Sequence, residues 1–92
     1  MIIFISGPIS NNPNYREHFK AAQDYLEVRG YIVLSPTCLN PNLSYDKLMT
    51  ICRTMIDVSD AVYMLRNWTI SPGACDENTY AMVQNKQIIY EE

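Results

Sequence analysis

Four short runs of mostly hydrophobic residues divide the chain, at residues 2–5, 31–34, 61–65 and 87–90. The hydrophobic residues in these runs are consecutive and do not alternate with polar ones, which is typical of strands covered on both faces of a sheet. We therefore expect four strands, each buried on both faces.

The segments between these runs have the spacing of helices. Asn12 is a candidate N-cap for the first helix, Pro13 suits its first turn, and Gly30 marks its end. Hydrophobic residues recur there every three or four positions, as on one face of an amphipathic helix: Tyr15, Phe19, Ala22 and Leu26.

Two further helices are predicted. Ser44 can cap the second, and Ser71 can cap the third, which begins at Pro72 and continues to about residue 84. The buried face of the second helix is indicated by residues at similar spacings: Tyr45, Leu48, Cys52, Met55 and Ser59, widened by Ile51 and Ile56.

Strands and helices therefore alternate along the chain, which predicts a parallel sheet with helices on both faces. The expected fold class is α/β, a small Rossmann-like or flavodoxin-like three-layer domain with a four-stranded parallel sheet. A chain of 92 residues closes around one core, so we expect a single domain over residues 1–92.

Composition and charge narrow the class of partner. The chain is 48% hydrophobic and 18% charged, with a net charge of −3, so neither a nucleic-acid polymer nor a membrane surface is expected as its partner. Its three cysteines form no C-x-x-C pair, which favours a reducing, cytoplasmic setting and neither a zinc site nor a disulfide framework.

In parallel sheets of this kind, ligands bind at the carboxyl ends of the strands. The loop after the first strand is a candidate for holding a sugar or phosphate, because glycine lets the backbone approach a ligand and serine offers a hydroxyl. Taken alone, it is more often a simple tight turn. Its residues are Ser6, Gly7, Pro8 and Ile9, followed by Ser10.

The start of the third helix is a richer candidate. Ser71 as N-cap, followed by Gly73 and Ala74, leaves N–H groups and a positive dipole end free of side-chain bulk, which suits an anion or a sugar hydroxyl. Glu77 shares a helix face with Ala74 and Ala81, so there is room beside its carboxylate. The alternative is a solvated glutamate on an exposed face, which spacing alone favours.

Other residues near the predicted site have ordinary explanations as well. Trp68 suits stacking on a base or anchoring a second subunit, and packing in the core explains it equally well. Tyr15 and Tyr45 begin helices beside the site and could line it. His18 is interpreted as a surface residue, and Cys75 as structural.

Three segments carry a family resemblance. Residues 3–9, Cys52 with residues 60–63, and the pattern W-x-x-S-x-G-A-x-x-E-x-x-x-A from Trp68 to Ala81 resemble the nucleoside 2-deoxyribosyltransferase superfamily. The chain is most similar to its short bacterial and phage members of unassigned function. The resemblance covers nearly all 92 residues.

This resemblance implies a Rossmann-like enzyme that cleaves the N-glycosidic bond of nucleosides or nucleotides, with no cofactor or metal, usually as a homodimer or larger homo-oligomer. The family's glutamate nucleophile matches Glu77, as in a retaining glycosidase. Members that transfer between nucleosides tend to carry an aspartate where this chain has Ser71, whereas 5′-monophosphate hydrolases carry serine. The resemblance therefore favours a nucleotide substrate.

Two positions depart from the family pattern. The family's tyrosine on the first strand falls on Phe4, and its catalytic aspartate falls on Cys52, eight residues before Asp60. A thiol is a poor proton donor to a departing base at neutral pH. Three hypotheses follow: an N-glycosidase or deoxyribosyltransferase, a nucleotide-binding module that breaks no bond, and an interaction protein that uses the fold as a scaffold.

Overall fold

The computed structural model describes all residues from 1 to 92 and confirms the predicted alternation of strands and helices. Two short 3-10 helices, η1 and η2, follow β2 and β3 and were not expected. The elements are β1 (Ile2–Ser6), α1 (Tyr15–Val28), β2 (Ile32–Leu34), η1 (Pro36–Cys38), α2 (Tyr45–Asp57), β3 (Ala61–Met64), η2 (Trp68–Ile70), α3 (Pro72–Val83) and β4 (Gln87–Tyr90).

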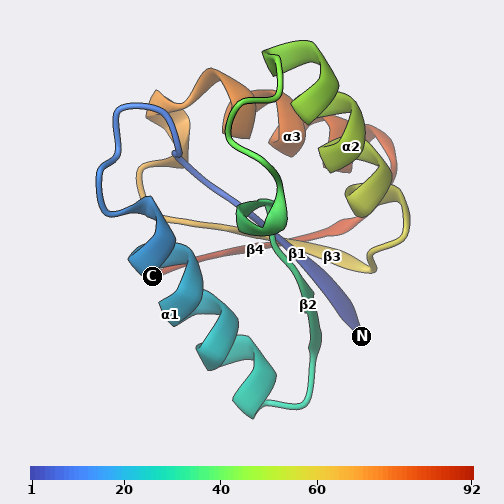
Figure 1. Ribbon diagram of the computed structural model, residues 1–92. Coiled ribbons are helices and arrows are strands. Elements are labelled where there is room, and N and C mark those ends of the chain that lie inside the picture. Colours follow the sequence, from blue (N-terminus) through green and yellow to red (C-terminus); the bar gives the residue numbers. More distant parts are fainter.

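The four strands form one parallel sheet in the order β2-β1-β3-β4. Helix α1 covers one face, and α2 and α3 cover the other, which gives the predicted three layers (Figure 1). The order reverses between β1 and β3, because the chain leaves β1 toward β2 and later returns to the other side of β1. In such sheets this reversal opens a crevice at the carboxyl ends of the two central strands.

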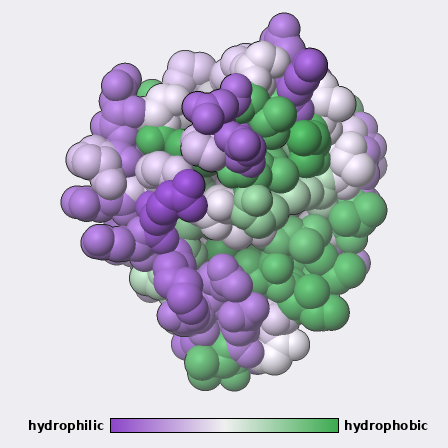
Figure 2. Space-filling model, in the orientation of Figure 1, coloured by the Kyte–Doolittle hydropathy of each residue, from purple (hydrophilic) through white to green (hydrophobic).

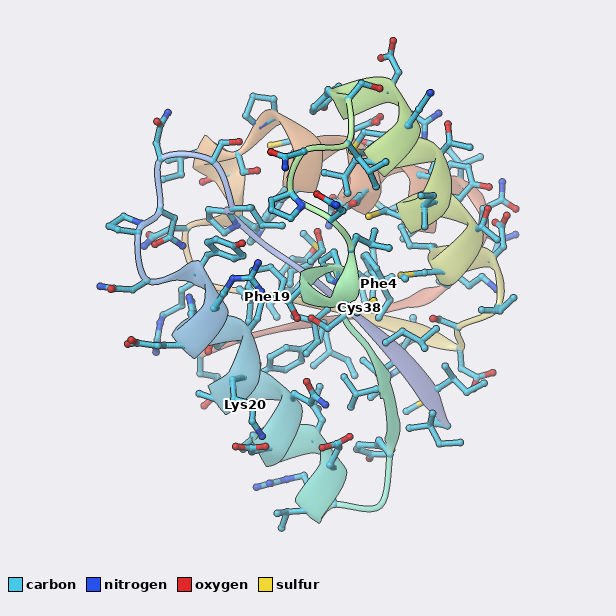
Figure 3. The ribbon with its side chains drawn as sticks, in the orientation of Figure 1. Phe4, Phe19, Lys20 and Cys38 are labelled. Carbon is cyan, nitrogen blue, oxygen red and sulfur yellow. The ribbon has the colours of Figure 1, made fainter.

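Alternation along β1 distributes its side chains between two hydrophobic cores. Ile3 and Ile5 pack under α1 with Phe19, whereas Phe4 packs under α2 and α3 (Figure 3). Ser6 follows Phe4 on the same face of the strand, so its hydroxyl points toward α3. The first core consists of Ile3, Ile5, Phe19, Ala22, Leu26, Ala61, Tyr63 and Leu65, and the second of Phe4, Cys52, Ile56, Val62, Met64, Ala74 and Ala81.

The prediction that all four strands are buried on both faces is wrong for β2 and β4. These strands are the edges of the sheet, and Ile32 at the start of β2 is 62% exposed. Only β1 and β3 have a strand on each side and helices above and below, so only their side chains are almost all buried. A run of hydrophobic residues does not distinguish a central strand from an edge strand.

The start of α1 also differs from the prediction. The helix begins at Tyr15, and its N-cap is Asn14, whose side chain makes no capping hydrogen bond. The Asn12 side-chain amide instead donates to the Pro8 carbonyl oxygen at 3.0 Å and closes the loop after β1. The caps predicted at Ser44 and Ser71 are confirmed, because each side chain accepts a backbone N–H three residues later.

The surface has an apolar region away from the predicted site. Figure 2 shows hydrophobic atoms gathered on the side of the molecule where β2 and the N-terminus lie. Met1 and Ile32 are both exposed and are joined by a hydrogen bond from the Ile32 N–H to the Met1 carbonyl oxygen at 3.1 Å. None of the three helices has the length and hydrophobicity needed to cross a bilayer.

Candidate active site

A cavity of about 640 Å³ opens at the carboxyl ends of β1 and β3. Its size lies within the usual range for small-molecule sites, roughly 300–1,000 Å³. The loop after β1 and the start of α3 meet here, as predicted, and side chains of α2 join them. The cavity is lined by residues 7–12, His18, Pro36, Tyr45, Leu48, Met49, Cys52, Arg66, Asn67, residues 70–74 and Glu77.

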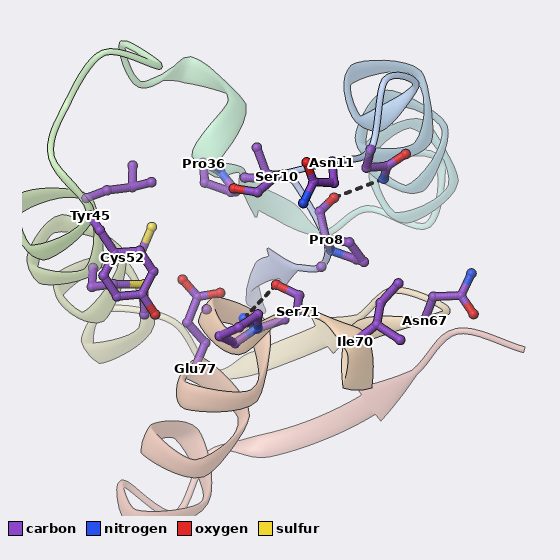
Figure 4. A pocket seen from close by; sticks show the side chains of 18 of the residues that line it. Pro8, Ser10, Asn11, Pro36, Tyr45, Cys52, Asn67, Ile70, Ser71 and Glu77 are labelled. Carbon is purple, nitrogen blue, oxygen red and sulfur yellow. Dashed lines mark hydrogen bonds between the residues drawn. The ribbon is translucent and has the colours of Figure 1, made fainter.

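Glu77 lies at the floor of this cavity, on the second turn of α3 (Figure 4). It is only 6% exposed, and the small side chains of Ala74 and Ala81 on the same helix face let α3 pack closely on the sheet. The Ser6 hydroxyl donates a hydrogen bond of 2.6 Å to its Oε1 atom. The predicted shared face is confirmed, and the alternative of a solvated glutamate is wrong.

The surroundings of Glu77 raise the pKa of its carboxyl group into the neutral range. Burial raises its pKa from 4.5 to about 7, because an ionised carboxylate loses hydration there. Hydrogen bonding from the Ser6 hydroxyl and the Cys52 thiol acts in the opposite direction and keeps the pKa from rising further. Near neutral pH, both the carboxylate and the carboxylic acid are therefore populated.

Cys52 is a neutral neighbour of this carboxylate. Its side chain is almost fully buried, and burial together with the negative charge of Glu77 raises the pKa of the thiol far above its ordinary value. Such a thiol stays protonated, so Cys52 is not a thiolate nucleophile. Phe4 is fully buried in the same core cluster and does not line the cavity.

The first turn of α3 forms one wall of the cavity. The Ser71 side-chain oxygen accepts the Ala74 N–H at 3.2 Å. The prediction that this N–H is free for a ligand is therefore wrong. Pro72 has no N–H, which leaves the N–H of Gly73 and the hydroxyl proton of Ser71 as donors. A side chain at Gly73 would extend toward Met49 and Tyr45 across the cavity, so glycine keeps this space open.

The loop after β1 forms the opposite wall. Gly7, Pro8 and Ile9 all line the cavity, as predicted. Gly7 also has a structural role, because a Cβ atom there would lie 2.8 Å from the Cβ atom of Leu65. Glycine therefore permits the ends of β1 and β3 to approach each other. The loop is thus a tight turn and a wall of the cavity at the same time.

Three predicted positions differ from the expectation. Trp68 does not line the cavity; its ring lies 5.9 Å from that of Tyr90, as in the core-packing alternative. Asp60 lies at the other end of β3, where its Oδ2 atom accepts the Ile2 N–H at 2.7 Å. His18 is not a remote surface residue, because it lies in the first turn of α1, which begins at the carboxyl edge of the sheet, and it lines the cavity.

A polar cluster beside the cavity was not predicted. The Oε1 atom of Glu91 accepts the Arg66 backbone N–H at 2.7 Å and lies 2.8 Å from His18 Nε2. Arg66 follows β3 and Glu91 follows β4, so both lie at the carboxyl edge of the sheet. This position after a strand is the one feature of the sequence that could have predicted the cluster. No group of three or more histidine, cysteine or acidic side chains is arranged to hold a metal ion.

Solved structures with similar folds come from several organisms. A protein described as 2-desoxiribosyltransferase from Leishmania mexicana matches 97% of this chain with a TM-score of 0.75 and 21% identity. The CMP N-glycosidase BcmB of Clostridium botulinum matches 98% with a TM-score of 0.74 and 19% identity. A 2-deoxyribosyltransferase of Bacillus psychrosaccharolyticus matches 98% with a TM-score of 0.75 and 18% identity.

These likenesses confirm the fold expected from the resemblance. The chain spans 62% of the Leishmania protein and about 70% of the other two. No protein with a curated description matches the sequence. A family model described as "Domain of unknown function (DUF4406)" matches residues 1–90, and the chain therefore belongs to the DUF4406 family, with the α/β fold of the 2-deoxyribosyltransferases.

Proposed function

We propose that this protein cleaves the N-glycosidic bond of a nucleoside or nucleotide with Glu77 as nucleophile. The observation that carries the proposal is a single carboxylate, 6% exposed and held by Ser6, at the floor of a cavity large enough for a nucleotide. The similarly folded proteins named as 2-deoxyribosyltransferases and as a CMP N-glycosidase support the same class of reaction.

The reaction has two steps. The Glu77 carboxylate attacks the anomeric carbon of the sugar, a glycosyl ester forms, and the bonding electron pair leaves with the base, which takes up a proton from water. Water or a second base then attacks the same carbon and releases the carboxylate. Water gives hydrolysis and a second base gives transfer. The Ser6 hydroxyl holds the carboxylate in place through its Oε1 atom.

A 5′-monophosphate is the substrate class that the cavity wall favours. The Ser71 hydroxyl and the Gly73 N–H are donors at the positive end of α3, where a phosphate is stabilised. Both residues line the cavity together with Glu77. We therefore expect the phosphate at the first turn of α3 and the anomeric carbon at its second turn.

The test is incubation of the purified protein with ribonucleoside and 2′-deoxyribonucleoside 5′-monophosphates, with free base followed by proton NMR. We expect free base from at least one nucleotide, and less from the matching nucleoside without phosphate. Intact nucleotides throughout, with no selective line broadening, would argue against the proposal.

A second candidate function is binding of a nucleotide without cleavage. Retaining glycosidases use two carboxyl groups, whereas Glu77 is the only carboxyl group lining this cavity and Cys52 stays neutral. Calorimetry distinguishes the two candidates: saturable heat of binding with no free base in the same sample favours the binding module.

The pH dependence of cleavage should report the ionisation of Glu77. Since attack needs the carboxylate, kcat/KM should rise with pH through an apparent pKa near 7. Replacing Ser6 by alanine removes a hydrogen bond to the carboxylate, so the rise in kcat/KM should shift to higher pH. Measuring kcat/KM from pH 5 to 9 for both proteins tests this. A Ser6→Ala profile that falls in height without moving along the pH axis would contradict it.

We also propose that the protein is a homodimer or larger homo-oligomer. Ile70 lines the cavity yet is 75% exposed, so a second copy covering it would complete the rim of the site. Sedimentation velocity at micromolar concentration should show a species of at least twice 10.6 kDa. A monomer alone under these conditions would refute this part of the proposal.

A further inference from the structure

The start of α2 approaches the start of α3 across the cavity. Tyr45 is the first residue of α2, and its N-cap is Ser44, whose side chain accepts the Lys47 N–H. A Cβ atom built on Gly73 would lie 3.8 Å from Cε1 of the Tyr45 ring and 3.9 Å from its hydroxyl oxygen. Figure 4 shows Tyr45 on the α2 side of the cavity, opposite Ser71. The Tyr45 hydroxyl therefore lies beside the first turn of α3, where we expect the phosphate.

The Tyr45 hydroxyl has no hydrogen-bond partner within the chain. Two other tyrosine hydroxyls are engaged, since that of Tyr80 donates to Asp57 at 2.7 Å and that of Tyr90 accepts the Asn78 side-chain amide at 3.4 Å. Tyr45 lines the cavity, yet it is 55% exposed, so its hydroxyl is bonded to solvent. A ligand oxygen can take the place of that solvent without breaking any contact in the protein.

A phosphate at the first turn of α3 needs more donors than that turn supplies. A phosphate monoester has three strong acceptor oxygens, whereas the turn offers one hydroxyl and one N–H. The basic side chains that line the cavity are already engaged. His18 Nε2 lies 2.8 Å from Glu91 Oε1, and the Arg66 guanidinium donates to the Glu92 carbonyl oxygen at 2.7 Å. The third donor must therefore come from another part of the cavity wall.

We propose that Tyr45 is a substrate-binding residue whose hydroxyl donates the third hydrogen bond to the 5′-phosphate. This inference rests on the proposed function, which places the phosphate at Ser71 and Gly73. The Gly73 nitrogen is two bonds from the Cβ position and so at most about 7 Å from the Tyr45 hydroxyl. Two hydrogen bonds of about 2.8 Å each, through the oxygens of one phosphate group, span that gap. Tyr45 thereby favours a nucleotide over the nucleoside.

The test removes the Tyr45 hydroxyl alone. Tyr45→Phe is introduced into the Glu77→Gln protein, which lacks the nucleophile and leaves the ligand intact. Calorimetry first finds which of the common 2′-deoxynucleoside 5′-monophosphates binds most tightly, and then compares it with the matching nucleoside. A hydrogen bond to a charged group corresponds to about tenfold in affinity or more. We expect Tyr45→Phe to weaken nucleotide binding by at least about tenfold and to leave nucleoside binding unchanged.

A second measurement observes the phosphate itself. The phosphorus NMR signal of the bound nucleotide is followed with pH in the Glu77→Gln protein, with and without Tyr45→Phe. A donor to the phosphate favours its dianion, so loss of the Tyr45 hydroxyl should raise the second pKa of the bound phosphate. A role in packing α2 would not move this pKa. Tyr25→Phe is the matched control, because Tyr25 is similarly exposed on α1 and does not line the cavity. It should change neither the affinity nor the phosphate pKa.

The outcomes separate this inference from the proposed function. Unchanged nucleotide affinity in Tyr45→Phe overturns the role of Tyr45 and leaves the proposed function standing. An equal loss of nucleotide and nucleoside affinity with an unchanged phosphate pKa also overturns it, because the hydroxyl then contacts the sugar or the base. If no nucleotide binds to the Glu77→Gln protein and the parent releases no base, the proposed function fails and the role of Tyr45 fails with it.

Discussion

Replacing Glu77 by glutamine should lower the rate of base release by about 10⁴-fold or more, because the amide has no negative oxygen to attack the anomeric carbon. The variant keeps the shape of the side chain, and its amide oxygen can still accept the Ser6 hydroxyl. Nucleotide binding should therefore persist while cleavage is lost. Release of base at saturating nucleotide, followed by proton NMR, measures this effect.

Asp76→Asn is the matched control for this variant. Asp76 is the neighbouring carboxylate on α3, but it is partly exposed, pairs with Arg53 at 2.6 Å and does not line the cavity. It should retain most of the parent activity. Equal turnover by Glu77→Gln and the parent would remove Glu77 from the reaction, even if the cavity binds nucleotides.

Replacing Glu77 by glutamine should also stabilise the protein at alkaline pH. A carboxyl group whose pKa is raised from 4.5 to about 7 by burial binds its proton more tightly in the folded than in the unfolded state. The free energy of unfolding is therefore highest while Glu77 is protonated and falls as pH rises from about 4.5 to about 7. At about 1.4 kcal/mol per pKa unit, the loss is about 3 kcal/mol.

Glutamine at position 77 carries no proton to lose, so the variant escapes this loss. From pH 4 to pH 8, the stability of Glu77→Gln relative to the parent should grow by about 3 kcal/mol. For a domain of this size, that corresponds to a difference in Tm of roughly 10 to 20 °C. Thermal unfolding of both proteins at the two pH values measures it. A difference that stays constant between pH 4 and pH 8 would mean that Glu77 ionises as an exposed glutamate does.

The two expectations describe one trade-off at the floor of the cavity. The fold buries Glu77 between α3 and β1, where its ionised form costs stability, and the Ser6 hydroxyl recovers part of that cost. An alanine or leucine at this position would pack in the same place without that penalty. The buried carboxylate is therefore better explained by chemistry than by stability.

Local sequence signals were sufficient to predict the fold and part of the site. Consecutive hydrophobic residues located the strands, and the serine caps located the starts of α2 and α3. The placement of Ala74 and Ala81 beside Glu77 followed from the helical repeat. The resemblance added the proposed role of Glu77 as nucleophile, which no spacing could have given.

The remainder depended on tertiary contacts that no local pattern encodes. Glu91, which follows β4, meets His18 beside the cavity although the two residues lie 73 positions apart in the sequence. Trp68 packs against Tyr90 for the same reason, since η2 and the end of β4 are neighbours only in the folded chain. The hydrogen bond that Glu77 accepts in its buried position comes from Ser6, which lies 71 residues earlier.

The most direct test of the central claim is a search for the glycosyl ester on Glu77. The protein is mixed with a nucleotide that carries fluorine at the 2′ carbon, which slows both steps, and a base that is a good leaving group, which keeps the first step faster than the second. The glycosyl ester then accumulates, and the intact mass of the protein is measured. We predict an increase equal to one fluorinated sugar phosphate less water, located on the peptide that contains Glu77 and absent from Glu77→Gln. Release of base with no change in protein mass, or with an adduct on another residue, would contradict it.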